Sequence, residues 1–435
     1  MRRKLRLALR RLLTMANLFE NLVEVYGDRE VLSLGNSLDY RLFPSRILTY
    51  RDCVLFTNLA AEALIRELDL KKGERALTII PNPGEFLLLS MAVIKAGGII
   101  VPLDHRLPED EIRRRAEGCW AGLAVIDGRV LAERPDLAES MPAVERLMVS
   151  GPRRQAPGGF PSLDEAMDES SGFFIPYTLK PGNVVGLFYS SGRNGSPRAV
   201  MATNEMLLGA RRTAGLLLPA GPGDRCACAL PPTSLPGFSA AVLGLCMGLR
   251  FYLLPDGDPE RILRALQESK PTVFVASPVL YAGMLEAGAD GYDLSPVRLW
   301  FGAGGSVHPG DIDAFRRLGS LRLGPLRLPA VFAEACGVEE SAPMAALRLA
   351  LSGAVRTAAR PCFPLPPNRM KVVDETGRGV QRGEEGELLL KGPGVTPGYW
   401  NDLEETFRDI RDGWLHTGTG ARKGRYGVTD MGSGL

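Results

Sequence analysis

Regular alternation between short apolar runs and amphipathic segments constrains this chain more than any other feature of its sequence. The segments follow in the order helix 50–68, strand 75–80, helix 83–96, strand 98–101, helix 109–117 and strand 123–126. Strands separated by helices can pair in parallel, because the connecting helices then cover both faces of the sheet. The sequence therefore predicts an α/β fold with a parallel sheet.

The alternation resumes after residues 151–159, a polar stretch rich in Pro and Gly that indicates a loop between two lobes. Further elements are expected as strands at 184–188, 226–230, 273–276 and 298–301 and as a helix from Glu205. Residues 366–400 differ, because two short strands, 371–373 and 387–391, are separated by turn residues. This pattern is typical of a small β-barrel or β-rich subdomain.

Charge is distributed unevenly along the 435 residues. The formal net charge is +2, but residues 1–14 hold six cations and no acid, so the rest of the chain is mildly acidic. This balance provides no basic surface for a nucleic acid. The seven cysteines include no C-x-x-C pair, and the three histidines have no partner at metal-ligand spacing. We therefore expect reduced, buried thiols in a cytoplasmic protein and no zinc site.

The basic residues 1–14 have the pattern of an amphipathic helix. Its apolar face would consist of Leu5, Ala8, Leu9, Leu12 and Leu13. Such a helix suits an anionic membrane surface, although it is too short and too charged to span a bilayer. The alternative is that Met15 is the true start. Peripheral membrane contact through residues 1–14 is thus one of two hypotheses for this segment.

A loop rich in Gly, hydroxyl groups and Arg follows the strand expected at 184–188 and is expected to lead into a helix. Its residues are Ser190, Ser191, Gly192, Arg193, Asn194, Gly195, Ser196, Pro197 and Arg198. Backbone N–H groups and hydroxyls in such a loop can bind phosphate oxygens while the cations neutralise charge. Most Gly/Ser turns are only turns, so this interpretation depends on the remaining motifs.

Later motifs add glycines after a strand and two adjacent acids. They lie at 300–306, 336–341, 386–388, 398–401 and 413–418. Three glycines after the strand at 298–301 allow a ligand to approach the backbone closely. Glu339 and Glu340 follow Gly337 and offer carboxylate ligands for Mg²⁺.

The order and spacing of these motifs resemble those of the AMP-forming adenylating enzymes, which include acyl- and aryl-CoA synthetases, luciferases and peptide-synthetase adenylation domains. The similarity runs from about residue 20 to the end and is strongest over 386–418. It implies a large N-terminal domain of two α/β subdomains and a β-barrel, followed by a small C-terminal domain. We expect residues 15–418 to form the large domain. Residues 419–435 would be a remnant of the hinge and the start of the small domain, which is otherwise absent.

The resemblance implies that ATP and Mg²⁺ are used to turn a carboxylic acid into an acyl-adenylate, with CoA as an acyl acceptor. Arg198 and Glu340 would be catalytic, and Glu340 would bind the metal. The implied nucleotide-binding residues are Ser190, Ser191, Gly192, Arg193, Asn194, Gly195, Gly304, Gly305, Cys336, Gly337, Glu339 and Thr419. The acid pocket would include Ser234, Gly237 and Gly302. This chemistry needs charge neutralisation and in-line geometry more than a protein nucleophile.

Several positions depart from the family's pattern. Arg193 and Asn194 replace two Thr, and Arg198 replaces a Lys. Glu339 replaces a Thr near the α-phosphate, and Thr419 replaces the Asp that binds both ribose hydroxyls. Because hydrogen bonds to a charged group contribute about 1.5–3 kcal/mol, Thr419 predicts at least about tenfold weaker ATP binding.

Two hypotheses for function stay open. The chain is either an acid–thiol ligase with weakened ATP affinity or a degenerate homologue that binds a ligand or a partner protein. One such partner would supply the missing domain.

Overall fold

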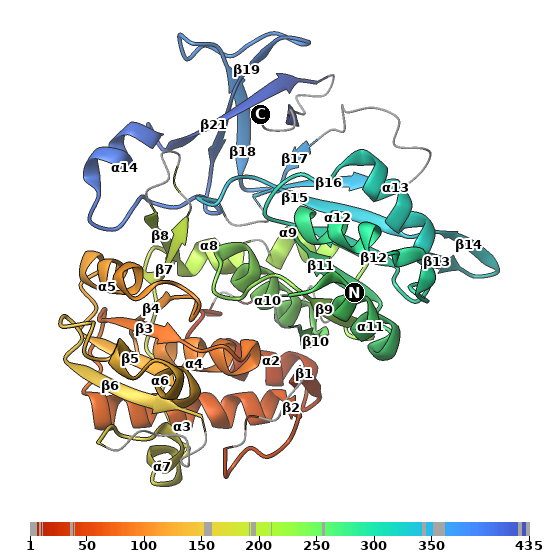
Figure 1. The fold of residues 1–435 in the computed structure, drawn as a ribbon. Coiled ribbons are helices and arrows are strands. Elements are labelled where there is room, and N and C mark those ends of the chain that lie inside the picture. Colours follow the sequence, from red (N-terminus) through yellow and green to blue (C-terminus); the bar gives the residue numbers. More distant parts are fainter. Residues whose placement is uncertain are drawn as a thin grey trace.

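Two sheets and the helices on their faces form the part of the chain that the structure describes (Figure 1). In the computed structural model that part comprises residues 7, 10, 12–34, 38, 40–151, 159–190, 192, 197–209, 211–254, 257–341, 345–350, 362–424 and 429–431. The larger sheet has 14 strands and the smaller has six, with a separate two-stranded hairpin. The α/β class predicted from the alternation is confirmed.

The six-stranded sheet has the order β6-β5-β3-β4-β7-β8. Its strands are β3 (Arg75–Ile79), β4 (Ile99–Pro102), β5 (Leu123–Asp127), β6 (Arg146–Ser150), β7 (Val184–Ser190) and β8 (Arg198–Thr203). The helices of this lobe are α3 (Tyr50–Leu68), α4 (Pro83–Lys95), α5 (Glu109–Gly118), α6 (Gly128–Glu133), the 3₁₀ turn η1 (Pro135–Leu137) and α7 (Leu163–Asp168). The predicted elements between residues 50 and 126 are therefore confirmed.

The loop after β7 joins two antiparallel strands, and the helix expected from Glu205 is confirmed, although the strand β8 between loop and helix was not predicted. Strands β7 and β8 pair from Ser190 with Arg198 to Val184 with Thr203. Helix α8 (Asn204–Gly209) begins only after β8 ends. The first turn of α8 is thus separated from the loop by the length of β8.

The 14-stranded sheet is parallel in its centre and antiparallel at one end. Its parallel part contains β1 (Glu30–Leu34), β9 (Arg225–Cys228), β10 (Arg250–Leu253), β11 (Val273–Ala276), β12 (Leu299–Gly302) and β15 (Val331–Cys336). Strand β2 (Ile47–Thr49) is antiparallel to β1 at the other edge. The β-rich region expected near 366–400 is the antiparallel end of this same sheet. It contains β16 (Ala346–Ala350), β17 (Cys362–Pro364), β18 (Arg369–Val373), β19 (Glu385–Lys391), β20 (Ile410–Arg411), β21 (Trp414–Lys423) and β22 (Thr429–Met431).

Helices cover this sheet and connect its parallel strands. They are α2 (Leu18–Tyr26), α9 (Arg211–Leu217), α10 (Leu235–Met247), α11 (Pro259–Ser269), α12 (Pro278–Glu286), the 3₁₀ turn η3 (Ala289–Gly291), α13 (Pro309–Leu318) and α14 (Leu403–Asp409). The hairpin β13 (Ser320–Leu323) and β14 (Leu326–Pro329) projects beside α13 (Figure 1). All seven cysteines are buried, as the sequence predicted.

The N-terminal segment packs against the body where the structure describes it. Leu7 and Leu13 are 2% and 5% exposed, whereas Leu12 is 83% exposed. The amide of Met15 donates to Asn204 Oδ1 at 2.7 Å. Most of residues 1–9 lie outside the described residues, so the amphipathic helix stays a prediction. Within the described ranges, the length and apolarity needed to cross a bilayer do not occur together in any helix.

A buried carboxyl group lies in the first turn of α4. Glu85 is 2% exposed, and the hydroxyl of Tyr40 donates to its Oε1 at 2.7 Å. The same hydroxyl accepts a hydrogen bond from the amide of Gly151 at 3.0 Å. Burial, together with the nearby Asp127 carboxylate, raises the pKa of Glu85 to about 7. The fold therefore holds this side chain in its protonated form over most of the acidic range.

We expect Glu85→Gln to raise stability at pH 8 and to leave it nearly unchanged near pH 4.5. The folded protein keeps the Glu85 proton until about pH 7, whereas the ordinary pKa is 4.5, so wild-type stability falls as pH rises between these values. The corresponding loss is roughly 3 kcal/mol. Urea unfolding of both proteins from pH 4.5 to 8 measures it. Parallel pH profiles for the two proteins would contradict this account.

Candidate functional site

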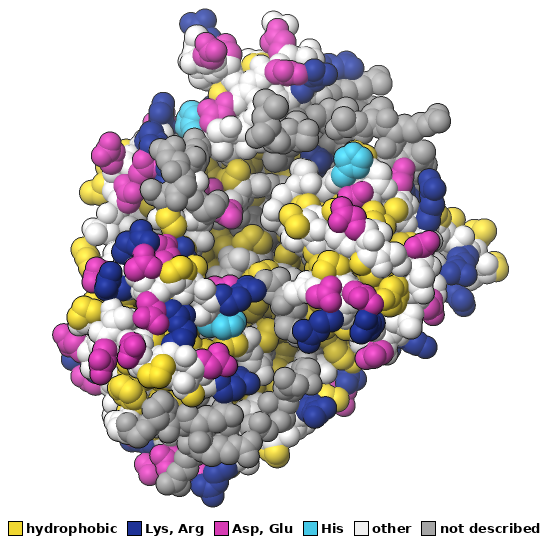
Figure 2. All heavy atoms as spheres, in the orientation of Figure 1, with side chains coloured by type: hydrophobic (Ala, Val, Ile, Leu, Met, Phe, Trp, Pro, Cys, Tyr) yellow, Lys and Arg dark blue, Asp and Glu magenta, His cyan; other side chains and the backbone are white. Residues whose placement is uncertain are grey.

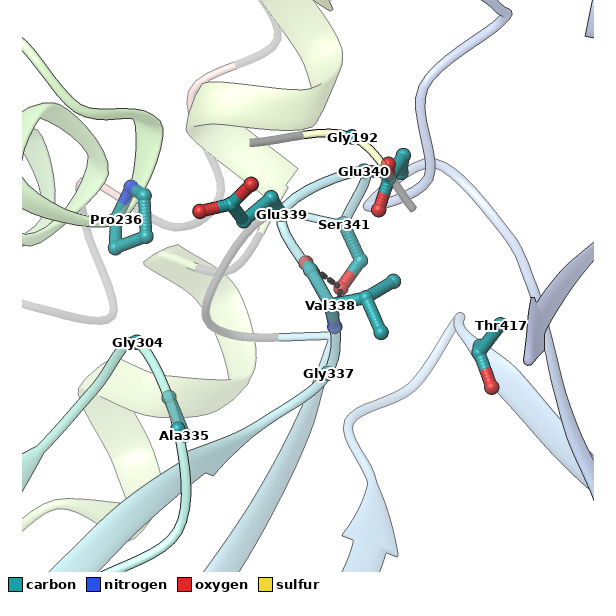
Figure 3. A pocket seen from close by; sticks show the side chains of 11 residues that line it. Gly192, Pro236, Gly304, Ala335, Gly337, Val338, Glu339, Glu340, Ser341 and Thr417 are labelled. Carbon is teal, nitrogen blue, oxygen red and sulfur yellow. Dashed lines mark hydrogen bonds between the residues drawn. The ribbon is translucent and has the colours of Figure 1, made fainter. Parts of the chain in front are cut away.

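A cavity of about 360 Å³ lies at the carboxyl ends of β12 and β15, where ligands bind in open α/β sheets. Its lining residues are Gly192, Pro236, Gly304, Gly305, Ala335, Gly337, Val338, Glu339, Glu340, Ser341 and Thr417 (Figure 3). The face seen in Figure 2 is hollowed between the two lobes. The volume lies within the range of roughly 300–1,000 Å³ that is usual for small-molecule sites.

Two glycine turns shape the wall of this cavity. Gly304 has φ +83°, a left-handed conformation that favours glycine. The neighbouring strand β15 is tied to this turn because Glu334 Oε1 accepts the amide of Val307 at 2.9 Å. At Gly337, an added Cβ would lie 2.3 Å from Ser341 Oγ. Gly304 thus leaves the backbone open to close approach by a ligand, whereas Gly337 makes room for the side chain of Ser341.

Two adjacent carboxylates supply the charge of the cavity. The Glu339 side chain points toward Pro236, and Glu340 lies beside Gly192 (Figure 3). Glu339 is exposed and Glu340 is half-buried. The hydroxyl of Tyr399 lies 3.1 Å from Glu340 Oε1. Carboxylates at these positions are of the kind that bind a metal ion.

The hydroxyl groups of the cavity are turned to the backbone. Ser341 Oγ donates to the carbonyl of Val338 at 3.0 Å, and Thr417 Oγ1 donates to the carbonyl of Leu388 at 2.7 Å. The two carboxylates are therefore the hard oxygen ligands of the cavity. Mg²⁺ is commonly held by one or two carboxylates together with substrate phosphates, so this donor set fits the ion. Across the described ranges, no three His, Cys, Asp or Glu side chains gather into a metal site.

The structure brings together about half of the nucleotide-binding residues implied by the sequence. Those that line the cavity are Gly192, Gly304, Gly305, Gly337 and Glu339, and Glu340, which was predicted to bind the metal, lies with them. Cys336 is buried at the end of β15, directly before Gly337. Ser190 is 4% exposed, and within the described part of the chain its hydroxyl has no hydrogen-bond partner. Ser191, Arg193, Asn194 and Gly195 lie outside the described residues.

Thr417, which the sequence reasoning missed, lines the cavity, whereas Thr419 does not. The register between β19 and β21 shifts between Glu387 and Leu389, so residues near 418 bulge out of the ladder. Glu387 holds the bulge because its Oε1 accepts the amide of Gly418 at 2.8 Å. The alternation of side chains along a strand indicates which residues share a face, but alternation alone does not show where a bulge shifts that pattern. The ribose contact implied for Thr419 stays a prediction.

Arg198 lies apart from the cavity. It is 8% exposed, and its Nη1 lies 2.9 Å from Asp409 Oδ2, while Nη2 pairs with Glu405. Its guanidinium also lies over the ring of Tyr399, 5.1 Å from the centroid. With Tyr399 it lines a second, polar cavity. The phosphate contact implied for Arg198 stays a prediction, and the described contacts of its guanidinium are with acids and an aromatic ring.

The residues expected in the acid pocket have structural roles around the cavity. Ser234 Oγ accepts the amide of Gly237 at 3.2 Å and so caps α10. A Cβ on Gly237 would lie 2.0 Å from the carbonyl oxygen of Pro231, and one on Gly302 would lie 2.9 Å from Val307. Contact of these three residues with an acid stays a prediction. Pro236, in the first turn of α10, lines the cavity although it was not among the three residues predicted.

A small apolar cavity of about 40 Å³ lies between α10 and the sheet. It is lined by Leu218, Ala220, Cys226, Ala240, Leu243, Gly244, Met247, Leu249, Phe251, Val273, Val275, Leu299 and Phe301. Helix α10 connects the two spaces, since Pro236 faces the first cavity and Ala240, one turn later, faces the apolar one. Apolar space thus begins one helical turn from the charged cavity.

Comparison with known protein families identifies one that most of this chain matches. Residues 19–400 match the model of the AMP-binding enzyme family. The chain is 28% identical over 387 residues to 4-coumarate–CoA ligase 4 of Arabidopsis thaliana, covering 86% of this chain and 66% of that protein. It therefore spans about two thirds of the length of this curated relative.

Solved structures share the fold at lower identity. A long-chain-fatty-acid–CoA ligase from Archaeoglobus fulgidus superposes with a TM-score of 0.83 at 20% identity, covering 98% of this chain and 84% of the other. The inhibitor-bound N-terminal domain of FACL13 from Mycobacterium tuberculosis superposes with a TM-score of 0.80 at 17% identity, covering 97% and 100%. The family match over most of the chain and these superpositions agree, and the chain belongs to the AMP-binding enzyme family.

Proposed function

We propose that this chain binds ATP with Mg²⁺ and activates a carboxylic acid as an acyl-adenylate. The observation that carries the proposal is the cavity in which Gly304, Gly337 and Glu340 meet at the carboxyl ends of β12 and β15. These are positions at which the resemblance implies nucleotide and metal binding. The curated relative is a CoA ligase, which supports CoA as the acyl acceptor. Residues 15–418 would form the adenylate-forming unit.

Glu340, with Glu339 beside it, would hold the metal, and the glycine turns would take the nucleotide against the backbone. Bound Mg²⁺ supplies charge neutralisation on the phosphate oxygens. Ser190, whose buried hydroxyl has no hydrogen-bond partner among the described residues, is a candidate phosphate contact at the end of β7. The protein's part is then to orient the acid and the α-phosphate and to exclude water.

The acid that fits best has an apolar body. The space one helical turn along α10 is lined by apolar residues and Gly244 and measures about 40 Å³, so it would take the end of a hydrocarbon or aryl group without loss of hydrogen bonds. A whole ring or chain would require the lining side chains to move. The names of relatives point the same way, since they include a ligase of 4-coumarate and one of long-chain fatty acids. The carboxylate would then face the cavity that contains Glu340.

A second candidate function is ligand or partner binding without adenylation. Two observations favour it. The guanidinium of Arg198 is engaged by Asp409 and Glu405, and Glu339 adds an anion to a cavity that should receive phosphates. Like charges at close range oppose binding unless a cation intervenes. Nucleotide binding and catalysis must therefore be measured separately.

We expect wild-type protein to bind ATP with Mg²⁺, to bind it more weakly in EDTA, and to release pyrophosphate when an apolar acid is added. Glu340→Gln keeps the shape of the side chain but removes its charge, so the Mg²⁺ dependence of ATP binding should weaken about tenfold or more. Calorimetry and a pyrophosphate assay measure the two effects. Glu286→Gln, an exposed change at the far end of α12, is the matched control.

The outcomes separate the two candidate functions. No ATP binding at millimolar concentration would contradict nucleotide activation. ATP binding without pyrophosphate release across aryl and fatty acids would instead favour the binding function.

Thr419→Asp should tighten nucleotide binding by about tenfold, because a carboxylate accepts hydrogen bonds from both ribose hydroxyls where one hydroxyl cannot. The side chain is half-buried, and its amide donates to Thr417 Oγ1 at 3.1 Å, so the change is made next to a cavity residue. Titration with AMP and with 2′-deoxy-AMP measures the gain. Equal affinity of variant and wild type for AMP would show that the side chain at 419 does not meet the ribose.

A further inference from the structure

A chain of polar side chains connects Glu340 to the start of β8. Tyr399 Oη lies 3.1 Å from Glu340 Oε1 and 3.0 Å from Asp409 Oδ2. Asp409 Oδ2 in turn accepts a hydrogen bond from Arg198 Nη1 at 2.9 Å, and Arg198 also pairs with Glu405. We call Arg198, Glu340, Tyr399, Glu405 and Asp409 the Tyr399 network.

The centre of the Tyr399 network is buried and fixed by backbone contacts. Tyr399 is 3% exposed and Asp409 is 1% exposed. The segment that carries Tyr399 is attached to β8, because the amide of Trp400 donates to the carbonyl of Ala199 at 2.8 Å. Glu340 is attached to the same segment, because its carbonyl accepts the amide of Thr396 at 2.9 Å. The distances within the network are therefore set by the fold.

The hydroxyl of Tyr399 has one proton and two neighbouring carboxylates. Asp409 is already compensated by cations, with Arg198 on Oδ2 and Arg408 Nε on Oδ1 at 3.1 Å. The Tyr399 hydroxyl can therefore donate its proton to Glu340 Oε1 at 3.1 Å. If the guanidinium at 198 were withdrawn, Asp409 would compete for that proton.

We propose that Tyr399 is a positioning residue for Glu340, and that Arg198 acts on the site through Asp409 and Tyr399 rather than by contact with the triphosphate. The proposal rests on the function proposed above, because it takes Glu340 as the metal ligand. A hydrogen bond donated to Oε1 fixes the orientation of the carboxylate. Because Arg198 donates a hydrogen bond to Asp409, the Tyr399 hydroxyl is available to donate to Glu340.

The test is Mn²⁺ binding, followed by electron paramagnetic resonance with and without ATP. Tyr399→Phe removes the hydroxyl and leaves no buried charge unpaired, and we expect it to raise the Mn²⁺ dissociation constant about tenfold. Tyr189→Phe is the matched control, because the Tyr189 hydroxyl lines the same polar cavity but donates to the carbonyl of Arg115 at 2.8 Å. The control should bind Mn²⁺ as the wild type does. Circular dichroism and melting temperature verify folding.

Arg198→Lys tests the second half of the proposal, since it keeps the charge and loses the fork that reaches Asp409 and Glu405 together. Alone it should weaken Mn²⁺ binding, and in the Tyr399→Phe background it should add nothing. The same additional loss of ATP affinity in both backgrounds, with AMP affinity unchanged, would instead indicate contact with the triphosphate and overturn this part.

The remaining outcomes separate this inference from the proposed function. A folded Tyr399→Phe protein that binds Mn²⁺ and ATP like the wild type overturns the positioning role and leaves the proposed function standing. Mn²⁺ binding by the wild type without any ATP binding overturns the proposed function, while the tyrosine comparison still tests the positioning role. Wild-type protein that binds Mn²⁺ in neither condition overturns both.

Discussion

Burial of α4 on every side is the constraint on which the relation between the two sheets depends. Residues 84–95 of this helix are all buried, and the helix contacts β3 and β4 of the smaller sheet and β1 of the larger. A helix that is apolar all round needs cover on all sides, and here both lobes supply it. The helix ends on Lys95, whose ammonium donates to Glu20 at 2.6 Å, Thr57 at 2.7 Å and Asn58 at 2.8 Å. Its three donors are thereby satisfied, so the charge is compatible with the core.

Much of this arrangement could be predicted from the sequence, because local periodicity reports burial. The continuous apolar run that becomes α4, the strand pair it separates and the central strands of the larger sheet all follow from local patterns. Strand β8 was not predicted, because residues 198–203 are a short segment between the Gly-rich loop and the helix expected from Glu205. Its antiparallel pairing with β7 is a tertiary contact that local patterns do not report.

The candidate site likewise has some residues that the sequence predicts and others that it does not. The glycine turns at 304 and 337 and the acid pair could be found because each is a short contiguous motif. The Tyr399 network could not, because Arg198 and Asp409 are separated by about half of the chain and meet only through the fold. Thr417 was missed for a third reason, since the bulge opposite Glu387 changes which threonine of the strand faces the cavity. Contacts between distant segments and irregular strand register are the features that a single sequence conceals.

The cavity wall draws on widely separated parts of the polypeptide: Gly192 from the smaller sheet's hairpin, Gly304 and Gly337 from the larger sheet, and Thr417 from β21. During synthesis the parts of the cavity wall are therefore made one after another, and Thr417 on β21 is made last. A small molecule that binds there has no complete receptor on a nascent chain. Such a ligand can stabilise the folded protein, but it cannot guide the earlier steps of folding. The core around α4 must therefore form by burial of its own apolar surfaces.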